Sequence, residues 1–244
     1  DIIKDLKTAK TQYGENVENI FFSDGNTILM KTKDLLRLLN CCKKLFPKSK
    51  RITMYGSDKY INLKSLDEFI QLKEAGLSRI HCGMESGNDE VLKFTNKGFT
   101  RKEMAKAGKL IKKANIELSM YYIVGLGGTK LSKDHAIDNG TLINEINPEF
   151  IRIRTLLIFK DTPLYELYKQ NKFQLLDAHG ALHETKLFVE TLDNINSHFL
   201  SDHRANYYKI NGKIPEDKQK ILEDLNYALS LDKSNFRSPT SGTL

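Results

Sequence analysis

Apolar residues recur along the chain in two alternating patterns, one typical of helices and one typical of strands. Spacings of three and four residues, as at Ile2, Leu6, Ala9 and Tyr13, predict amphipathic helices. Short apolar runs bounded by glycine, proline or polar residues predict strands. The predicted strands cover residues 17–22, 52–57, 79–85, 116–124 and 150–159.

The helical pattern fills the intervals between these strands. Because the strands alternate with helices, we expect parallel strands joined by right-handed crossovers, which is an α/β fold. Glycine or proline ends several of the helices, as at Gly14, Pro47 and Gly76. The predicted helices cover residues 2–13, 35–46, 66–75, 89–94, 104–114, 132–146 and 163–169.

Several of the predicted strands are apolar on one face only. Ile80, Cys82 and Met84 alternate with polar residues in the third strand, and the fourth and fifth strands show a similar alternation. A parallel strand that is covered by helices on both faces is apolar throughout. We therefore expect the polar faces to line the interior of a wide barrel that can accommodate a ligand.

The strand and helix alternation stops near residue 170 and divides the chain into three predicted parts. Residues 1–170 form the barrel, and because a helical pattern is already under way at Asp1, we expect the chain to be a piece of a longer protein. Residues 171–232 form an extension with two helices that packs on the barrel. Residues 233–244, rich in Ser, Thr, Gly and Pro, are expected to be disordered.

Charge and cysteine content narrow the class of protein. The net charge is +7, with lysines spread over the predicted helix faces, which is typical of a solvated surface; attraction to a phosphate-bearing substrate or RNA is the alternative. No run of about 18 apolar residues and no basic-then-apolar leader is present, so we expect a cytoplasmic protein without a membrane partner. Cys41, Cys42 and Cys82 lack metal-ligand spacing and are expected to be reduced thiols.

Small and polar residues gather where the predicted strands end. Parallel α/β folds place their functional groups at the carboxyl ends of strands. Glycine, which lets a backbone approach a ligand closely, occurs at four of the five ends, and acidic or hydroxyl groups accompany it at three. This pattern favours a ligand that has an amine, hydroxyls and a flat ring. The ends comprise residues 23–26, 55–57, 83–87, 123–128 and 154–155.

Three runs of residues carry a family resemblance. They are AGLSRIHCGMESGNDEVL (residues 75–92), SMYYIVGLGG (119–128) and residues 153–165. In that order they resemble the fourth-strand signature, the fifth-strand motif, and the sixth strand with its exit turn, of the radical S-adenosylmethionine (SAM) superfamily, in the group that contains oxygen-independent coproporphyrinogen oxidase. The resemblance extends from Asp1 to about Tyr168. It implies a partial (β/α)6-type, TIM-like barrel of parallel strands that lacks the first strand, with a C-terminal helical extension.

The resemblance implies that the strand ends bind SAM. Ser23, Asp24 and Gly25 lie where the family has a glycine-glycine-glutamate motif that holds the SAM amino group, although only part of that motif is present here. Glu85 lies where an acidic or amide side chain accepts hydrogen bonds from the ribose hydroxyls, and Ser86 is a supporting candidate.

Further positions imply contacts to the SAM carboxylate and to the adenine. Lys97 lies where an arginine of the family pairs with the SAM carboxylate, and nearby Arg101 is an alternative for that contact. Tyr121 and Ile123 match inward positions beside the adenine, and Gly125 gives the ring clearance from the backbone.

The sequence does not settle the roles of several other polar residues. Arg154 is expected to point into the barrel and to serve SAM or an anionic substrate. His81 is expected to be a hydrogen-bonded structural group. The polar run at residues 201–207 either closes over the barrel mouth or makes a turn. No catalytic residue is assigned.

The resemblance also implies a four-iron four-sulfur cluster. In the family, three thiolates of a Cys-x3-Cys-x2-Cys loop hold the cluster, and this chain contains no such motif. Cys41 and Cys42 do not replace it, because adjacent residues of a helix point about 100° apart. We expect the loop to precede this chain, which therefore contributes no metal ligand; the alternative is a relative that has lost the cluster.

These implications give one principal hypothesis and two alternatives. The principal one is an enzyme that cleaves SAM to a 5′-deoxyadenosyl radical, which abstracts hydrogen from a small-molecule or peptide substrate, with flavodoxin or ferredoxin as electron donor. The first alternative is a scaffold that binds SAM or a related nucleoside without chemistry. The second, an RNA-modifying enzyme of the same superfamily, rests only on the positive charge, and a nucleic-acid partner is not expected.

Overall fold

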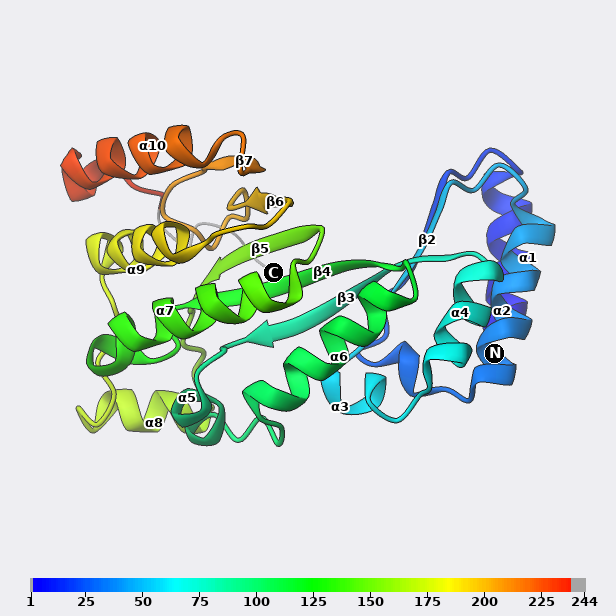
Figure 1. Ribbon diagram of the computed structural model, residues 1–244, viewed down its shortest axis with the longest axis horizontal. Helices are drawn as coiled ribbons and strands as arrows, with labels where there is room; N and C mark the ends of the chain where they lie inside the picture. The colour runs from blue at the N-terminus through cyan, green and yellow to red at the C-terminus, as the bar shows by residue number, and fades with distance from the viewer. Residues whose placement is uncertain (1, 238–244) are drawn as a thin grey trace. The chain divides into compact units, whose positions relative to one another are not determined.

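A computed structural model of the chain describes residues 2–237 (Figure 1). The helices are α1 (Ile2–Tyr13), α2 (Thr32–Leu45), α3 (Asp58–Ile61), α4 (Leu66–Glu74), α5 (Asp89–Phe94), α6 (Arg101–Lys113), α7 (Gly128–Ile146), α8 (Pro163–Lys169), α9 (Ala178–Thr191) and α10 (Lys218–Ser230), with 3₁₀ turns η1 (Thr27–Leu29) and η2 (Lys233–Asn235). The strands are β1 (Asn19–Phe22), β2 (Arg51–Tyr55), β3 (Leu77–Glu85), β4 (Glu117–Val124), β5 (Phe150–Thr155), β6 (Ser197–Leu200) and β7 (Asn211–Ile214).

The seven strands follow one another in a sheet in the order β1-β2-β3-β4-β5-β6-β7. The pairings β1–β2, β2–β3 and β5–β6 are parallel, and β6–β7 is antiparallel. This mostly parallel sheet with intervening helices confirms the predicted α/β class. From β1 to β6, at least one helix connects each strand to the next. Parallel pairing requires such a crossover connection.

Two strands occur where the sequence predicted only a polar and aromatic connection. Both β6 and β7 have four residues, too few for an alternation of apolar and polar positions to stand out. In β6 only Ser197 and Phe199 are buried, so half of its buried positions carry a polar side chain. Because β6 pairs with β5, residues 171–232 add strands to the sheet as well as the two predicted helices.

The chain divides into two compact units. The first contains the residues up to 83 and residues 102–119, and the second contains residues 84–101 and those from 120 onwards. In the first unit, α1, α2 and α4 lie side by side (Figure 1). Its core contains Leu35, Leu39, Phe69 and Leu72, which are fully buried and belong to α2 and α4.

The second unit is built around the packing of α7, α9 and α10 (Figure 1). Helices α7 and α9 approach each other closely at Gly140, where an added Cβ would lie only 2.6 Å from the Cβ of Thr191. Phe188 and Val189 of α9 are fully buried beneath this contact. The small residue therefore sets how near the two helices come, which brings side chains of α9 within reach of β4 and α7.

The predicted disordered tail is only partly described. Residues 233–235 form the turn η2, in which Asp232 caps the backbone N–H of Ser234, whereas residues 238–244 of the predicted tail lie outside the described residues. Among the helices of residues 2–237, none has both the length and the apolar character needed to cross a membrane.

Candidate active site

The end of β3 holds its last residue in an unusual backbone conformation. Glu85 has φ +59°, in the left-handed region that favours glycine. Six other non-glycine residues share this region, and all are Asn or Asp, the side chains that tolerate it best: Asn96, Asn115, Asn147, Asp161, Asn171 and Asn194. Glu85 is therefore the exception among the described residues. Such strain concentrates at functional sites, where the surrounding structure holds it in place.

The carboxylate of Glu85 forms an ion pair with the ammonium of Lys97. Both side chains are partly buried, at 29% and 24% exposure, and the Lys97 ammonium also lies 5.6 Å from the centre of the Phe99 ring. The structure thus brings together the two residues expected to face the SAM ribose and the SAM carboxylate. They pair with each other, a contact that the sequence did not indicate.

The loop after Glu85 is tied to α7. The backbone N–H of Gly87 donates to Oδ1 of Asn139 at 2.8 Å, and the side-chain amide of Asn88 donates to Asp138 at 2.6 Å. An added Cβ on Gly87 would lie 2.9 Å from the backbone oxygen of Asp138. The loop therefore lies directly against the α7 backbone.

Ser86 and Arg101 have structural partners in this loop. The buried hydroxyl of Ser86 accepts the N–H of Asn88 at 3.0 Å, which closes a local turn. The guanidinium of Arg101 donates to the backbone oxygens of Gly87 and Asp138. Arg101, the predicted alternative to Lys97, is thus engaged in holding the loop to α7.

The partly exposed positions of β4 and β5 include three predicted site residues, Tyr121, Ile123 and Arg154. In β4, Tyr121 and Ile123 are partly exposed while Tyr122 and Val124 are buried, as the predicted alternation requires. The guanidinium of Arg154 in β5 lies 5.4 Å from the centre of the Tyr121 ring, within the range of a cation–π interaction. A planar aromatic surface and a positive charge therefore lie together beside the end of β4.

Gly125 follows β4 with φ +84°, which accounts for the glycine. Space alone does not require it, because an added Cβ would meet only Leu176, at an ordinary contact distance of 3.6 Å. Its backbone N–H donates to Oε1 of the buried Glu184 at 2.7 Å. The sequence indicated the glycine but not this distant partner.

Ser23, Asp24 and Gly25 belong to the first unit, whereas the other predicted SAM-binding residues belong to the second. All three are exposed and follow β1. The backbone oxygen of Asp24 accepts the hydroxyl of Thr27, and an added Cβ on Gly25 would meet nothing within 4 Å. The space beside Gly25 is therefore open, whereas the backbone oxygen of Asp24 already has a partner.

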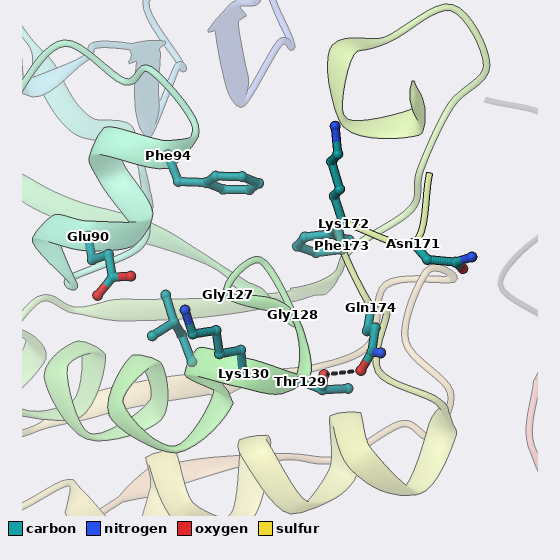
Figure 2. Close-up of a pocket in the computed structure, with 11 residues that line it drawn as sticks. Glu90, Phe94, Gly127, Gly128, Thr129, Lys130, Asn171, Lys172, Phe173 and Gln174 are labelled. Carbon is teal, nitrogen blue, oxygen red and sulfur yellow. Dashed lines mark hydrogen bonds between the residues drawn. The ribbon is translucent and has the colours of Figure 1, made fainter. Parts of the chain in front are cut away.

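A cavity of about 420 Å³ opens beside the first turn of α7 in the second unit (Figure 2). The rings of Phe94 and Phe173 stack over it with their centres 6.0 Å apart, and Thr129 bonds to Gln174 at 3.0 Å at its edge. The sequence pointed to the glycines of this turn but not to residues 171–174, which have no periodic pattern. The lining residues are Glu90, Phe94, 127–131 and 171–174.

The polar run at residues 201–207 is anchored to β5. The side-chain amide of the buried Asn206 donates to the backbone oxygen of Ile153 at 2.9 Å and accepts the hydroxyl of Thr155 at 3.1 Å. Burial and the nearby charge of Arg154 lower the pKa of His203 below its usual value. The segment is therefore a packed connection, and its His203 remains neutral near Arg154.

The thiols of the described residues do not fit a four-iron four-sulfur cluster. Cys41 and Cys42 are neighbours on α2, and Cys82 lies buried in β3, where its thiol contacts Asp58 at 3.3 Å. Within residues 2–237, no group of three or more Cys, His, Asp or Glu side chains is placed to hold a metal ion. We therefore derive no chemical step through a cluster held by these residues.

Alkylation should distinguish the three thiols. Burial, followed by the neighbouring Cys41, raises the pKa of Cys42 to about 12, so at pH 8 only about one molecule in 10⁴ carries the reactive thiolate. In the native protein, iodoacetamide should modify the partly exposed Cys41 and leave Cys42 and Cys82 unmodified, as read by peptide mass spectrometry. In urea all three should react. Native modification of Cys42 at the rate of Cys41 would contradict this packing.

A protein-family model matches the chain. The family model described as the radical SAM superfamily matches residues 1–138, which is more than half of the chain. The matched range includes Glu85, Lys97, Tyr121 and Gly125.

Curated relatives are similar to the chain over part of their own length. The chain is 26% identical over 121 residues to the tRNA uridine(34) acetyltransferase of Methanocaldococcus infernus, covering 49% of this chain and 21% of that protein. It is 26% identical over 167 residues to the heme chaperone HemW of Buchnera aphidicola, covering 68% of this chain and 42% of that protein. The chain thus spans less than half the length of these relatives.

Solved structures share the fold. Coproporphyrinogen III oxidase (HemN) from Escherichia coli aligns with a TM-score of 0.60 at 15% identity, over 78% of this chain and 44% of that one. The Elp3 of Methanocaldococcus infernus aligns with a TM-score of 0.59 at 16% identity, over 92% and 57%. These similarities confirm the predicted TIM-like, partial-barrel fold.

Proposed function

Because the chain belongs to the radical SAM superfamily, we propose that it forms the SAM-binding core of an enzyme that abstracts a hydrogen atom from its substrate. Proteins of this superfamily use SAM and a four-iron four-sulfur cluster. The observation that carries the proposal is Glu85, a glutamate held in a left-handed conformation at the end of β3 and paired with Lys97. Backbone strain of this kind concentrates at functional sites, and the ion pair places a carboxylate and an ammonium beside it.

The residues of the chain would bind and orient SAM. The Glu85 carboxylate is suited to accept hydrogen bonds from the ribose hydroxyls, and the Lys97 ammonium to attract the SAM carboxylate. Before SAM binds, the pair neutralises both charges. SAM can therefore replace the ion pair by a carboxylate contact to Lys97 and hydroxyl donors to Glu85, so that both partly buried groups keep a partner.

Other side chains would complete this site. Tyr121 and Ile123 would flank the adenine, and Arg154 would serve SAM or an anionic substrate. Bound SAM and a four-iron four-sulfur cluster would supply a 5′-deoxyadenosyl radical and methionine, using one electron from a donor such as flavodoxin or ferredoxin; within residues 2–237 no group of side chains is placed to hold that cluster.

Isothermal titration calorimetry with SAM tests the binding step directly. We expect saturable binding to the protein, abolished by competing S-adenosylhomocysteine. The hydrogen-abstraction step is tested by measuring 5′-deoxyadenosine under anaerobic, reducing conditions with protein that carries a cluster. Failure to bind SAM would refute the proposal. SAM binding without 5′-deoxyadenosine from cluster-loaded protein would favour the non-catalytic scaffold instead.

RNA is a second candidate substrate class. The net charge is +7, and the chain is similar to an archaeal protein that carries the name tRNA uridine(34) acetyltransferase. This similarity weakens the expectation that nucleic acid is not a partner. If RNA binds through phosphate contacts, affinity for transfer RNA should fall steeply, by roughly tenfold or more, between 50 and 200 mM salt. Absent or salt-independent binding would remove this candidate.

A further inference from the structure

The side chain of Glu184 accepts four hydrogen bonds inside the second unit. Glu184 lies in α9 and is 2% exposed. Its Oε1 accepts the hydroxyl of Tyr122 and the N–H of Gly125, both at 2.7 Å. Its Oε2 accepts the hydroxyl of Ser132 at 2.5 Å, and Nδ1 of His135 lies 3.1 Å from Oε1. One carboxylate therefore joins β4, the turn that follows β4, and the first turns of α7.

The surroundings of His135 and Tyr122 determine which atoms carry the protons in their contacts with Glu184. An ionised carboxylate accepts hydrogen bonds only, so in a hydrogen bond with ionised Glu184 the Nδ1 of His135 is the donor. The His135 ring is fully buried, and within the described residues its Nε2 has no hydrogen-bond partner. Burial, and then the charge of Glu184, raise the pKa of Tyr122 well above its usual value, so its hydroxyl keeps its proton and donates.

The carboxylate shapes the turn at residues 125–128. Gly125 and Gly128 both have positive φ, at +84° and +61°, and a turn of this kind leaves backbone N–H groups without sheet or helix partners. Glu184 supplies the partner for Gly125 from 59 residues away in the sequence. Through Ser132 and His135 it also fixes the helix that continues from the turn.

A carboxylate is a poor choice for packing alone. Removing it from water is unfavourable, and apolar residues of similar volume fill a core with less penalty. The four contacts give the carboxylate a role that an apolar side chain would not fill. The turn lies directly after Tyr121 and Ile123, the residues proposed to flank the adenine.

We infer that Glu184 is a positioning residue that holds the Gly125–Gly128 turn in the shape that receives the adenine of SAM. This inference rests on the proposed function. Glu184 itself is buried and does not touch the ligand, so it acts through the backbone of the turn.

The test compares Glu184→Gln with Phe188→Leu. Glutamine keeps one acceptor oxygen and replaces the other by an NH₂ group, which cannot accept a hydrogen bond. The Gly125 N–H must then compete with the other groups around residue 184 for the single remaining oxygen. Phe188 lies one turn further along α9, with its ring 4.7 Å from that of Tyr122, and its loss weakens packing without removing a hydrogen bond. In both variants we would measure the melting temperature, SAM affinity by calorimetry, and hydrogen–deuterium exchange of peptides covering residues 122–132 without SAM.

We expect Glu184→Gln to weaken SAM binding by roughly tenfold and to speed amide exchange in the turn, whereas Phe188→Leu lowers the melting temperature with SAM affinity within about twofold of wild type. Equal losses of SAM affinity in the two variants, or unchanged affinity in Glu184→Gln, would overturn the inference. If wild-type protein fails to bind SAM, the proposed function fails instead. Should Glu184→Gln not fold, Tyr122→Phe removes a single donor and should weaken SAM binding by a smaller factor; no change in affinity or exchange would overturn the inference.

Discussion

Replacing Glu85 by glycine should weaken SAM binding by roughly tenfold or more while leaving the protein as stable as the wild type, within about 1 kcal/mol. The left-handed conformation of Glu85 strains any residue with a Cβ by about 1–2 kcal/mol, and glycine removes that strain. Against this gain stand the lost ion pair with Lys97 and the greater freedom of glycine in the unfolded chain, each about 1 kcal/mol or less. Calorimetry with SAM and thermal unfolding measure the two effects.

Three companion variants separate strain from ligand contact. Glu85→Ala keeps the strain and loses the carboxylate, so it should be less stable and bind SAM as weakly as Glu85→Gly. Glu85→Gln keeps a hydrogen-bond acceptor and should retain more SAM affinity than either. Asn115→Gly changes a left-handed residue of the first unit and should alter neither measurement appreciably. Wild-type SAM affinity in Glu85→Gly would show that Glu85 has no role in the site.

The parts of the fold that follow local periodicity were predictable. The five strands β1 to β5 lie close to their predicted positions because each is followed by a helix with its own apolar stripe and stop signal. The alternation in β4 correctly separated Tyr121 and Ile123 from the buried Tyr122. Strand ends also carried information, since a glycine such as Gly125 marks a positive φ.

Contacts between distant segments were not predictable from the same patterns. Glu184 lies in the extension for which two helices were predicted, but nothing in the sequence of α9 indicates that its carboxylate contacts a turn 59 residues earlier. Likewise, the pairing of Glu85 with Lys97 depends on how the chain folds back after α5. Such contacts depend on three-dimensional packing, which leaves no periodic pattern in a single sequence. The sequence therefore predicted which positions belong to the candidate site but not the contacts between their side chains.

Gly87→Ala should destabilise the protein by about 1–3 kcal/mol, a loss expected to lower its melting temperature by several degrees. The new methyl group would lie 2.9 Å from the backbone oxygen of Asp138 and 3.1 Å from the Cα of Asn139. Both atoms belong to the middle of α7, whose backbone cannot yield as the tip of a flexible side chain would. Relief requires the loop after β3 to move away, which also breaks the 2.8 Å hydrogen bond from Gly87 to Asn139.

That movement should also reach the SAM site, because the loop begins at Glu85. We therefore expect Gly87→Ala to reduce SAM affinity as well as stability, whereas Gly25→Ala, where an added Cβ meets nothing within 4 Å, should leave the melting temperature unchanged. Helix α7 holds the loop after β3 through Asp138 and Asn139 and the turn after β4 through Ser132 and His135 with Glu184. If α7 supports both the loop after β3 and the turn after β4, Gly87→Ala cannot keep both wild-type stability and wild-type SAM affinity. A Gly87→Ala protein that keeps both would show that the loop and the helix are not rigidly coupled.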